Sequence, residues 1–147
     1  MGQITAYREE DHDHLVDLWY RAVRETHAFL TEADIAFYRR IVDEQALKHV
    51  EVWVEKDDSG VPLGFIGLDG SMVEMLFVDP DRHGQGIGTG LLRYAEQLKG
   101  GRLRVDVNEQ NDGAYAFYQR YGFVRTGRSE LDGSGRPFPL LHLELKR

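Results

Sequence analysis

The sequence has no cysteine among its 147 residues, which excludes disulfide bonds, thiolate metal sites and a cysteine nucleophile. It also has no apolar run long enough to span a bilayer. Its first residues turn acidic instead of forming the apolar core of a secretion signal. We therefore expect a cytoplasmic protein that has no membrane partner.

Basic residues are outnumbered, because 18 lysines and arginines stand against 25 aspartates and glutamates and give a net charge of −7. They are not clustered either, so no nucleic-acid partner is expected. An acidic surface agrees with a cationic substrate such as an amine. The length and the 41% hydrophobic content predict one globular domain over residues 1–147.

Hydrophobic periodicity predicts strands and helices in the order β-α-α-β-β-β-α-β-α-β-β. Asp11 is the expected N-cap of the first helix, and Thr31 with Asp34 is the expected capping pair of the second. Helices are expected over residues 11–28, from 31, over 87–99 and from 111, and strands over 3–7, 49–55, 62–68, 72–78, 103–107, from 123 and over 140–145. This order predicts an α/β fold with a mixed α+β sheet that is mostly antiparallel and has one right-handed crossover.

Residues 79–90, the glycine turn, connect an apolar strand to a helix and have glycine at every second position from Gly84 to Gly90. The first N–H groups of a helix have no acceptor within it, and the helix dipole adds positive potential, so phosphate groups bind there. A P-loop is excluded because no Gly-Lys-Ser/Thr follows, and the spacing differs from the G-x-G-x-x-G of dinucleotide folds. The turn is predicted to bind an anion, with a purely structural turn as the alternative.

A second segment contains Asn111, Ala114, Phe117, Tyr118, Gly122 and Phe123. Together with His83-Gly84-Gln85-Gly86-Ile87-Gly88, it resembles the two signatures of the GCN-five-related N-acetyltransferases, the GNAT family. Most of the chain is also similar to the bacterial YjaB-like subgroup, and this similarity implies a lysine side chain of a protein as the acetyl acceptor. The resemblance implies a GNAT fold with helices on both faces of the sheet. It also implies transfer of an acetyl group from acetyl-CoA to a primary amine, either a small molecule or a protein lysine.

The resemblance further implies where the cosubstrate acetyl-CoA would bind. Its pyrophosphate would lie on the N–H groups of the glycine turn, and its pantetheine arm would pair with the preceding strand. A backbone N–H where the sheet splays would polarise the acetyl carbonyl. His83 replaces the Arg or Gln that is usual in the family, so one side-chain contact to the pyrophosphate would be either lost or replaced by a weaker, pH-dependent contact from the imidazole. The residues implied are Leu76, Phe77, Val78, His83, Gly84, Gln85, Gly86, Ile87, Gly88, Thr89, Asn111, Phe117 and Tyr118.

Direct attack by an amine needs a base for the ammonium proton and an acid for the leaving thiolate. Tyr118 matches the position of the acid in the family, while an aromatic core residue is the alternative. For the base, Glu74 is a candidate because strict alternation gives it the strand face of Leu76 and Val78. His27 is its rival and Asp106 has similar standing; for each, a purely structural or solvated side chain is the alternative.

Two further hypotheses stay open from the sequence. The first is a module that binds CoA or acyl-CoA without catalysis, as a sensor or an interaction protein. The second concerns assembly, since the sequence is compatible with a monomer or a homodimer. No metal is expected, because His12 and His14 are two residues apart on a predicted helix and their rings diverge.

Overall fold

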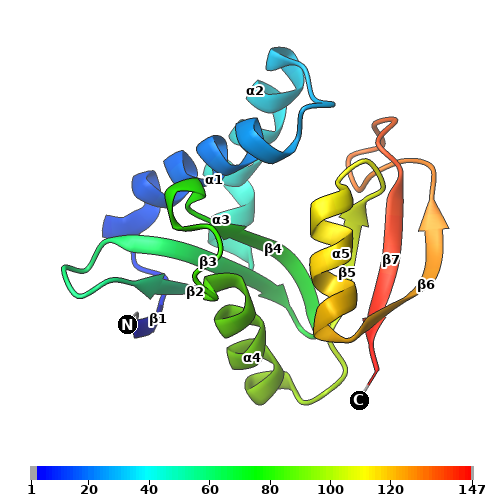
Figure 1. Ribbon diagram of the computed structural model, residues 1–147. Helices are drawn as coiled ribbons and strands as arrows, with labels where there is room; N and C mark the ends of the chain where they lie inside the picture. The colour runs from blue at the N-terminus through cyan, green and yellow to red at the C-terminus, as the bar shows by residue number, and fades with distance from the viewer. Residues whose placement is uncertain (1–2, 147) are drawn as a thin grey trace.

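The computed structural model describes residues 3–146, which form a seven-stranded sheet with helices on both faces (Figure 1). The order of strands and helices is the predicted one, except that a short helix over Leu47–His49 was not predicted between the second helix and the second strand. The strands are β1 (Gln3–Ala6), β2 (Glu51–Lys56), β3 (Pro62–Asp69), β4 (Met72–Val78), β5 (Arg104–Asn108), β6 (Phe123–Ser129) and β7 (Leu140–Leu145). The helices are α1 (His12–Thr26), α2 (Glu32–Ile41), α3 (Leu47–His49), α4 (Ile87–Lys99) and α5 (Asp112–Tyr121), with short segments η1 (Glu9–Asp11), η2 (Val42–Ala46) and η3 (Pro80–Arg82). Within this described part, no helix is both long and apolar enough to cross a membrane.

The strands lie in the order β1-β2-β3-β4-β5-β7-β6. Neighbouring strands are antiparallel except β4 and β5, which are parallel and joined through α4. A parallel pair needs such a crossover, whereas the antiparallel pair β2–β3 closes through a short turn. The predicted mixed, mostly antiparallel sheet is therefore confirmed.

The sheet splays between β4 and β5. Only two pairs of residues join these strands, Met72 with Arg104 and Val73 with Val105. Beyond Val73, the backbone of β4 has no strand partner on its β5 side among the described residues. An unpaired strand edge of this kind offers its N–H and C=O groups to an extended ligand.

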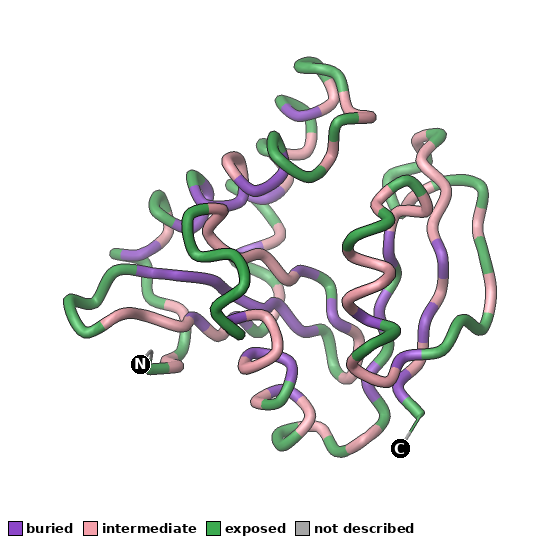
Figure 2. The backbone as a smooth tube through the Cα atoms, in the orientation of Figure 1, coloured by how far each residue is buried: buried purple, intermediate pink, exposed green. Residues whose placement is uncertain are grey.

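Two apolar clusters cover the two faces of the sheet. On one face α1 and α2 pack over β2, β3 and β4, with Trp19, Val54 and Phe65 buried between them. On the other face α4 and α5 pack with Leu91 and Leu143 in a cluster that extends from β3 to β7. β3 is buried along almost its whole length, as Figure 2 shows, because both layers meet it.

Helix limits agree with the sequence where a local signal sets them. Thr31 accepts a hydrogen bond from the N–H of Asp34, whose carboxylate accepts from the N–H of Thr31, so the predicted capping box is present. Asp11 is the N-cap residue of α1 as expected, but its side chain does not cap the helix. The carboxylate of Asp11 lies 2.7 Å from the Nζ of Lys56 at the end of β2, and it makes no capping hydrogen bond. This long-range ion pair displaces the local cap.

Candidate active site

The glycine turn leaves a row of backbone N–H groups without acceptors. Gly84 and Gly86 have φ of 77° and 78°, which side chains disfavour, and Gly86 is the N-cap of α4. The first helical hydrogen bond runs from the N–H of Gly90 to the carbonyl of Gly86 at 2.9 Å. The N–H groups of residues 85–89 donate to no acceptor in the part of the chain that the structure describes. This geometry suits a phosphate or pyrophosphate group.

An ion pair with α1 fixes the start of the turn. The guanidinium of Arg21 donates to both carboxylate oxygens of Asp79, at 2.9 and 3.1 Å. Asp79 also accepts a hydrogen bond from the N–H of Asp81 and so caps the short η3 segment. The hydrogen bonds from Arg21 lower the pKa of Asp79 from its usual range, although partial burial opposes them. The end of β4 is thus tied to α1 before the glycines begin.

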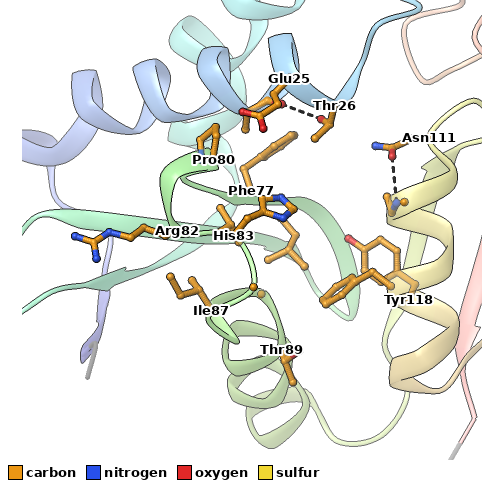
Figure 3. A pocket seen from close by; sticks show the side chains of 18 of the residues that line it. Glu25, Thr26, Phe77, Pro80, Arg82, His83, Ile87, Thr89, Asn111 and Tyr118 are labelled. Carbon is orange, nitrogen blue, oxygen red and sulfur yellow. Dashed lines mark hydrogen bonds between the residues drawn. The ribbon is translucent and has the colours of Figure 1, made fainter.

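A first cavity of about 570 Å³ connects the glycine turn with β4 and α5 (Figure 3). Twelve of the thirteen residues that the resemblance assigned to acetyl-CoA line it; Gln85 does not. Sequence reasoning missed several lining residues, of which Arg82 and Arg120 add positive charge and Glu25 and Thr26 come from the end of α1. Arg82 and Arg120 lie beside the recognised motifs, so proximity to the motifs is the signal that could have found them. The lining of the first cavity comprises Ala22, Glu25, Thr26, His27, Leu76, Phe77, Val78, Pro80, Arg82, His83, Gly84, Gly86, Ile87, Gly88, Thr89, Asn111, Gly113, Ala114, Phe117, Tyr118 and Arg120.

The α5 side of this cavity carries the second motif. Asn111 caps α5 by accepting a hydrogen bond from the N–H of Ala114 at 3.1 Å (Figure 3). Phe117 packs against the start of α4, where a Cβ on Gly88 would come within 3.2 Å of its ring. Tyr118 is only 7% exposed, and this burial raises its pKa, so the phenol stays protonated. Its hydroxyl group points into the cavity (Figure 3).

A second cavity of about 330 Å³ lies on the α1 and α2 side of the splay. Phe77 and His27 line both cavities, so they form a shared wall between them. The second cavity combines apolar and aromatic walls with carboxylates. Its lining includes Trp19, Tyr38, Glu74, Asp106, Asp132 and Phe138.

His27 follows the last turn of α1. Its Nδ1 is 2.7 Å from the hydroxyl of Thr26, and its ring is 5.3 Å from that of Phe29. Burial lowers the pKa of His27 to about 4, which leaves the imidazole neutral at neutral pH and makes it a weak base. The predicted rival for the role of base thus lines both cavities but has a reduced basicity.

Glu74 lies at an irregularity in β4. Gly67 pairs with Met75 and Leu68 with Val73, so Glu74 has no partner on β3, which is the pattern of a β-bulge. Strict alternation therefore fails here, and Glu74 lines the second cavity, whereas Leu76 and Val78 line the first. The pKa of Glu74 is raised by loss of hydration and then by the negative charges of Asp69 and Asp106. The structure does not bring Glu74 and Tyr118 into one cavity; they lie on either side of the shared wall.

Contacts between segments far apart in the sequence close the second cavity. The hydroxyl of Tyr38 on α2 donates to Asp132 in the β6–β7 turn. Arg136 in the same turn pairs with Asp34 at 2.7 Å and lies over the ring of Phe37, 3.8 Å from its centroid. Sequence periodicity contains no signal for this closure, because it depends on the turn folding back onto α2.

The side chain of His12 contacts two other segments of the chain. Its Nδ1 is 2.7 Å from the hydroxyl of Tyr7 and its Nε2 is 2.7 Å from Asp43, so it ties the start of α1 to the η2 segment. Asp13 belongs to the same small group of potential ligands. Both ring nitrogens have partners, and the expected absence of a metal stays a prediction.

Comparison with known proteins gives concordant matches. Residues 48–125 match the model of the acetyltransferase (GNAT) domain. The peptidyl-lysine N-acetyltransferase YjaB of Salmonella typhimurium is 43% identical over 143 residues, which cover 97% of each chain. The solution structure of apo-form YjaB from Escherichia coli has a TM-score of 0.90 at 38% identity and covers 98% of this chain and 97% of that one. The PaiA N-acetyltransferase of Thermoplasma acidophilum, solved in complex with coenzyme A, shares the fold with a TM-score of 0.81 at 23% identity, covering 100% of this chain and 99% of that one.

Proposed function

The chain belongs to the GNAT family and is an acetyl-CoA-dependent N-acetyltransferase, and we propose that it acetylates the side-chain amine of protein lysines. The names of the YjaB relatives support a lysine acceptor. The second cavity supports it as well, because an apolar slot with carboxylates fits an alkyl chain that ends in an ammonium group. We further propose a single domain over residues 1–147, of which 1–2 and 147 lie outside the described part, and a cytoplasmic monomer or homodimer.

Acetyl-CoA would bind in the first cavity, and the described residues fit it. The N–H groups of residues 85–89 would donate to the pyrophosphate, and the free edge of β4 would pair with the pantetheine amides. Asn111 and Phe117 line the path between these two contacts. Gly88 has to be small, because Phe117 already occupies the space beside it.

The splay of the sheet is the observation that carries this proposal. β4 and β5 separate after Val73, and Phe77 and His27 line both cavities. A thioester bound on one side can therefore face an amine that enters from the other. This arrangement holds the two reactants close together, which supplies much of the rate enhancement in group transfer.

We assign the acid to Tyr118 and the base to Glu74. Glu74 would take the ammonium proton, and its raised pKa makes it a stronger base than an ordinary carboxylate. The amine lone pair would then form the bond to the acetyl carbon, and the C–S electrons would move to sulfur, which takes the proton of Tyr118. The nitrogen of the new amide still carries one proton too many, and this proton would return to the phenolate of Tyr118. His27 is the alternative base because it lies at the shared wall, but its lowered pKa disfavours it.

The experiment measures release of the CoA thiol when the protein is incubated with acetyl-CoA and a panel of amines that includes lysine peptides. Tyr118→Phe should lower kcat about 100-fold, the order expected for a lost general acid, and leave acetyl-CoA affinity nearly intact. Tyr115→Phe on the same helix is the matched control, because Tyr115 lies outside the first cavity. Undiminished turnover in Tyr118→Phe would remove this residue from the mechanism. No turnover on any amine, with tight acetyl-CoA binding, would favour the alternative of a non-catalytic CoA-binding module.

A further inference from the structure

A chain of three side chains crosses the strands that follow the splay. The Nδ1 of His142 on β7 is 2.7 Å from the Oδ1 of Asp106 on β5, and its Nε2 is 2.6 Å from the Oγ of Ser129 at the end of β6. Asp106 and His142 are direct cross-strand partners, and Gly127 opposite His142 on β6 has no side chain to compete with the ring. Strand register therefore sets this contact, which the sequence alone could not show.

The chemistry of the groups fixes the direction of the hydrogen bond to Asp106. An ionised carboxylate only accepts, so the Nδ1 of His142 carries a proton and donates a hydrogen bond to Asp106. In the neutral imidazole, the Nε2 then accepts a hydrogen bond from the hydroxyl of Ser129. His142 is thereby held in one tautomer and one orientation, and it holds one oxygen of Asp106 in turn.

Of these three residues, Asp106 is the one that lines the second cavity. Leu141 and Leu143, the two neighbours of His142 on β7, are buried in the cluster beneath α5. The side chain of His142 therefore lies on the opposite face of β7. Val73 and Val105 are the last parallel pair before the splay, which makes Glu74 and Asp106 the next residues on the two strands. Both line the second cavity, so the first two residues beyond the last strand pair are carboxylates that face one space.

We propose that His142 and Ser129 are positioning residues which fix the carboxylate of Asp106 beside Glu74, so that its negative charge strengthens Glu74 as the proton acceptor. This proposal rests on the proposed function, in which Glu74 takes the ammonium proton. A like charge disfavours the ionised form of its neighbour, and its effect is steady only when the charge is held in place. Without His142, Asp106 is free to rotate into solvent, because about a third of its side chain is already exposed.

Other charged and titratable groups around the pair have to be separated from this effect. Asp69 on β3 also acts on Glu74, and the second cavity brings His27, Tyr38 and Asp132 to the same space. On the face of β7 that carries His142, the strand register places Glu144 two residues away, opposite Arg104. Glu144 does not line the second cavity, which makes Glu144→Gln a matched control.

The test is the carboxyl titration of Glu74, followed by carbon-13 NMR in the full-length protein. Asp106→Asn should move the midpoint for Glu74 to lower pH by several tenths of a pH unit, because a like charge has been removed. Because both His142→Leu and His142→Asn lack the imidazole and its charge, these two variants are compared with each other. His142→Asn, which keeps an amide N–H near the position of Nδ1, should have a higher midpoint for Glu74 than His142→Leu, because it still holds the carboxylate of Asp106. Glu144→Gln should leave the midpoint unchanged. An unchanged midpoint in Asp106→Asn, or equal midpoints for the leucine and asparagine variants of His142, would overturn the proposal.

Kinetics then separate this proposal from the proposed function. If Glu74 is the base, the acid limb of the kcat profile should move to lower pH in Asp106→Asn, and kcat on the plateau should fall several-fold while KM for acetyl-CoA stays unchanged. A shifted Glu74 titration with an unshifted kcat profile would retain the electrostatic effect of Asp106 on Glu74 but refute Glu74 as the base. An unshifted titration in a fully active enzyme would refute the role of His142 and leave the acetyltransferase activity standing.

Discussion

Replacement of Gly86 by alanine perturbs the proposed acetyl-CoA site through the backbone alone. Gly86 has φ 78° and ψ 11°, and an L residue in this left-handed region costs roughly 1–2 kcal/mol. No atom lies within 4 Å of an added Cβ, so the change displaces no side chain. Because Gly86 is the N-cap of α4, relief of the strain rotates the N–H groups that follow it. We expect acetyl-CoA binding to weaken about 5- to 30-fold, the factor that corresponds to this free energy.

The assay is isothermal titration with acetyl-CoA, together with chemical denaturation to measure the free energy of unfolding. Gly100→Ala is the matched control, because Gly100 ends the same helix with φ 78° and also has no atom within 4 Å of an added Cβ. Both variants should lose stability, but only Gly86→Ala should lose affinity. Equal losses of affinity in both, or full affinity in Gly86→Ala, would refute the assignment of the pyrophosphate to these N–H groups.

Two more predictions concern the surroundings of the two cavities. Asp79→Asn should lower the free energy of unfolding by about 1 kcal/mol at neutral pH, because it removes the charge that pairs with Arg21. The pKa of Asp79 is lowered on folding, so this contribution is present above about pH 4, the pKa range of unfolded aspartate, and is lost as the pH falls through the lowered pKa. Denaturation curves at several pH values measure it, and a difference from the wild type that persists at low pH would contradict the reasoning. Tyr38→Phe should raise KM for the amine about fivefold and leave KM for acetyl-CoA unchanged, because it removes the hydrogen bond to Asp132. Tyr20→Phe, which removes a hydrogen bond to Arg24 on α1, is the control. An equal effect in both variants would argue that the Tyr38–Asp132 hydrogen bond does not close the second cavity.

Local signals predicted the parts of the fold that depend on neighbours in sequence. α4 begins at Ile87 and ends at Lys99 as expected, because glycines flank a clear apolar period. Asn111 caps α5, and Gly122 ends it with φ 127°. The free N–H groups of the glycine turn are likewise set by local residues, and anion binding by them stays a prediction.

The features that sequence reasoning missed depend on contacts between distant segments. The bulge at Glu74 comes from the register of β4 on β3, which no pattern within β4 reveals. Asp106 and His142 meet because β7 inserts between β5 and β6. The side chain of Asp11 pairs with Lys56 instead of capping α1 for a similar reason, because Lys56 comes close only when β2 is in place. Both Asp106 and Asp11 are separated in sequence from their partners by at least one whole strand or helix.

Ile87 serves the interior and the binding surface at the same time. Its side chain is 5% exposed and packs so closely on β3 that a Cβ added to Gly64 would lie 2.9 Å from its Cγ2, while its N–H belongs to the free row above the first cavity. The same added Cβ would lie 3.0 Å from the carbonyl oxygen of Phe77, on the strand that would pair with pantetheine. A methyl group at Gly64 would therefore press on both backbone surfaces of the cosubstrate site from inside the protein. Affinity for acetyl-CoA is in this sense mechanically coupled to core packing, and a mutation that never touches the ligand can alter it.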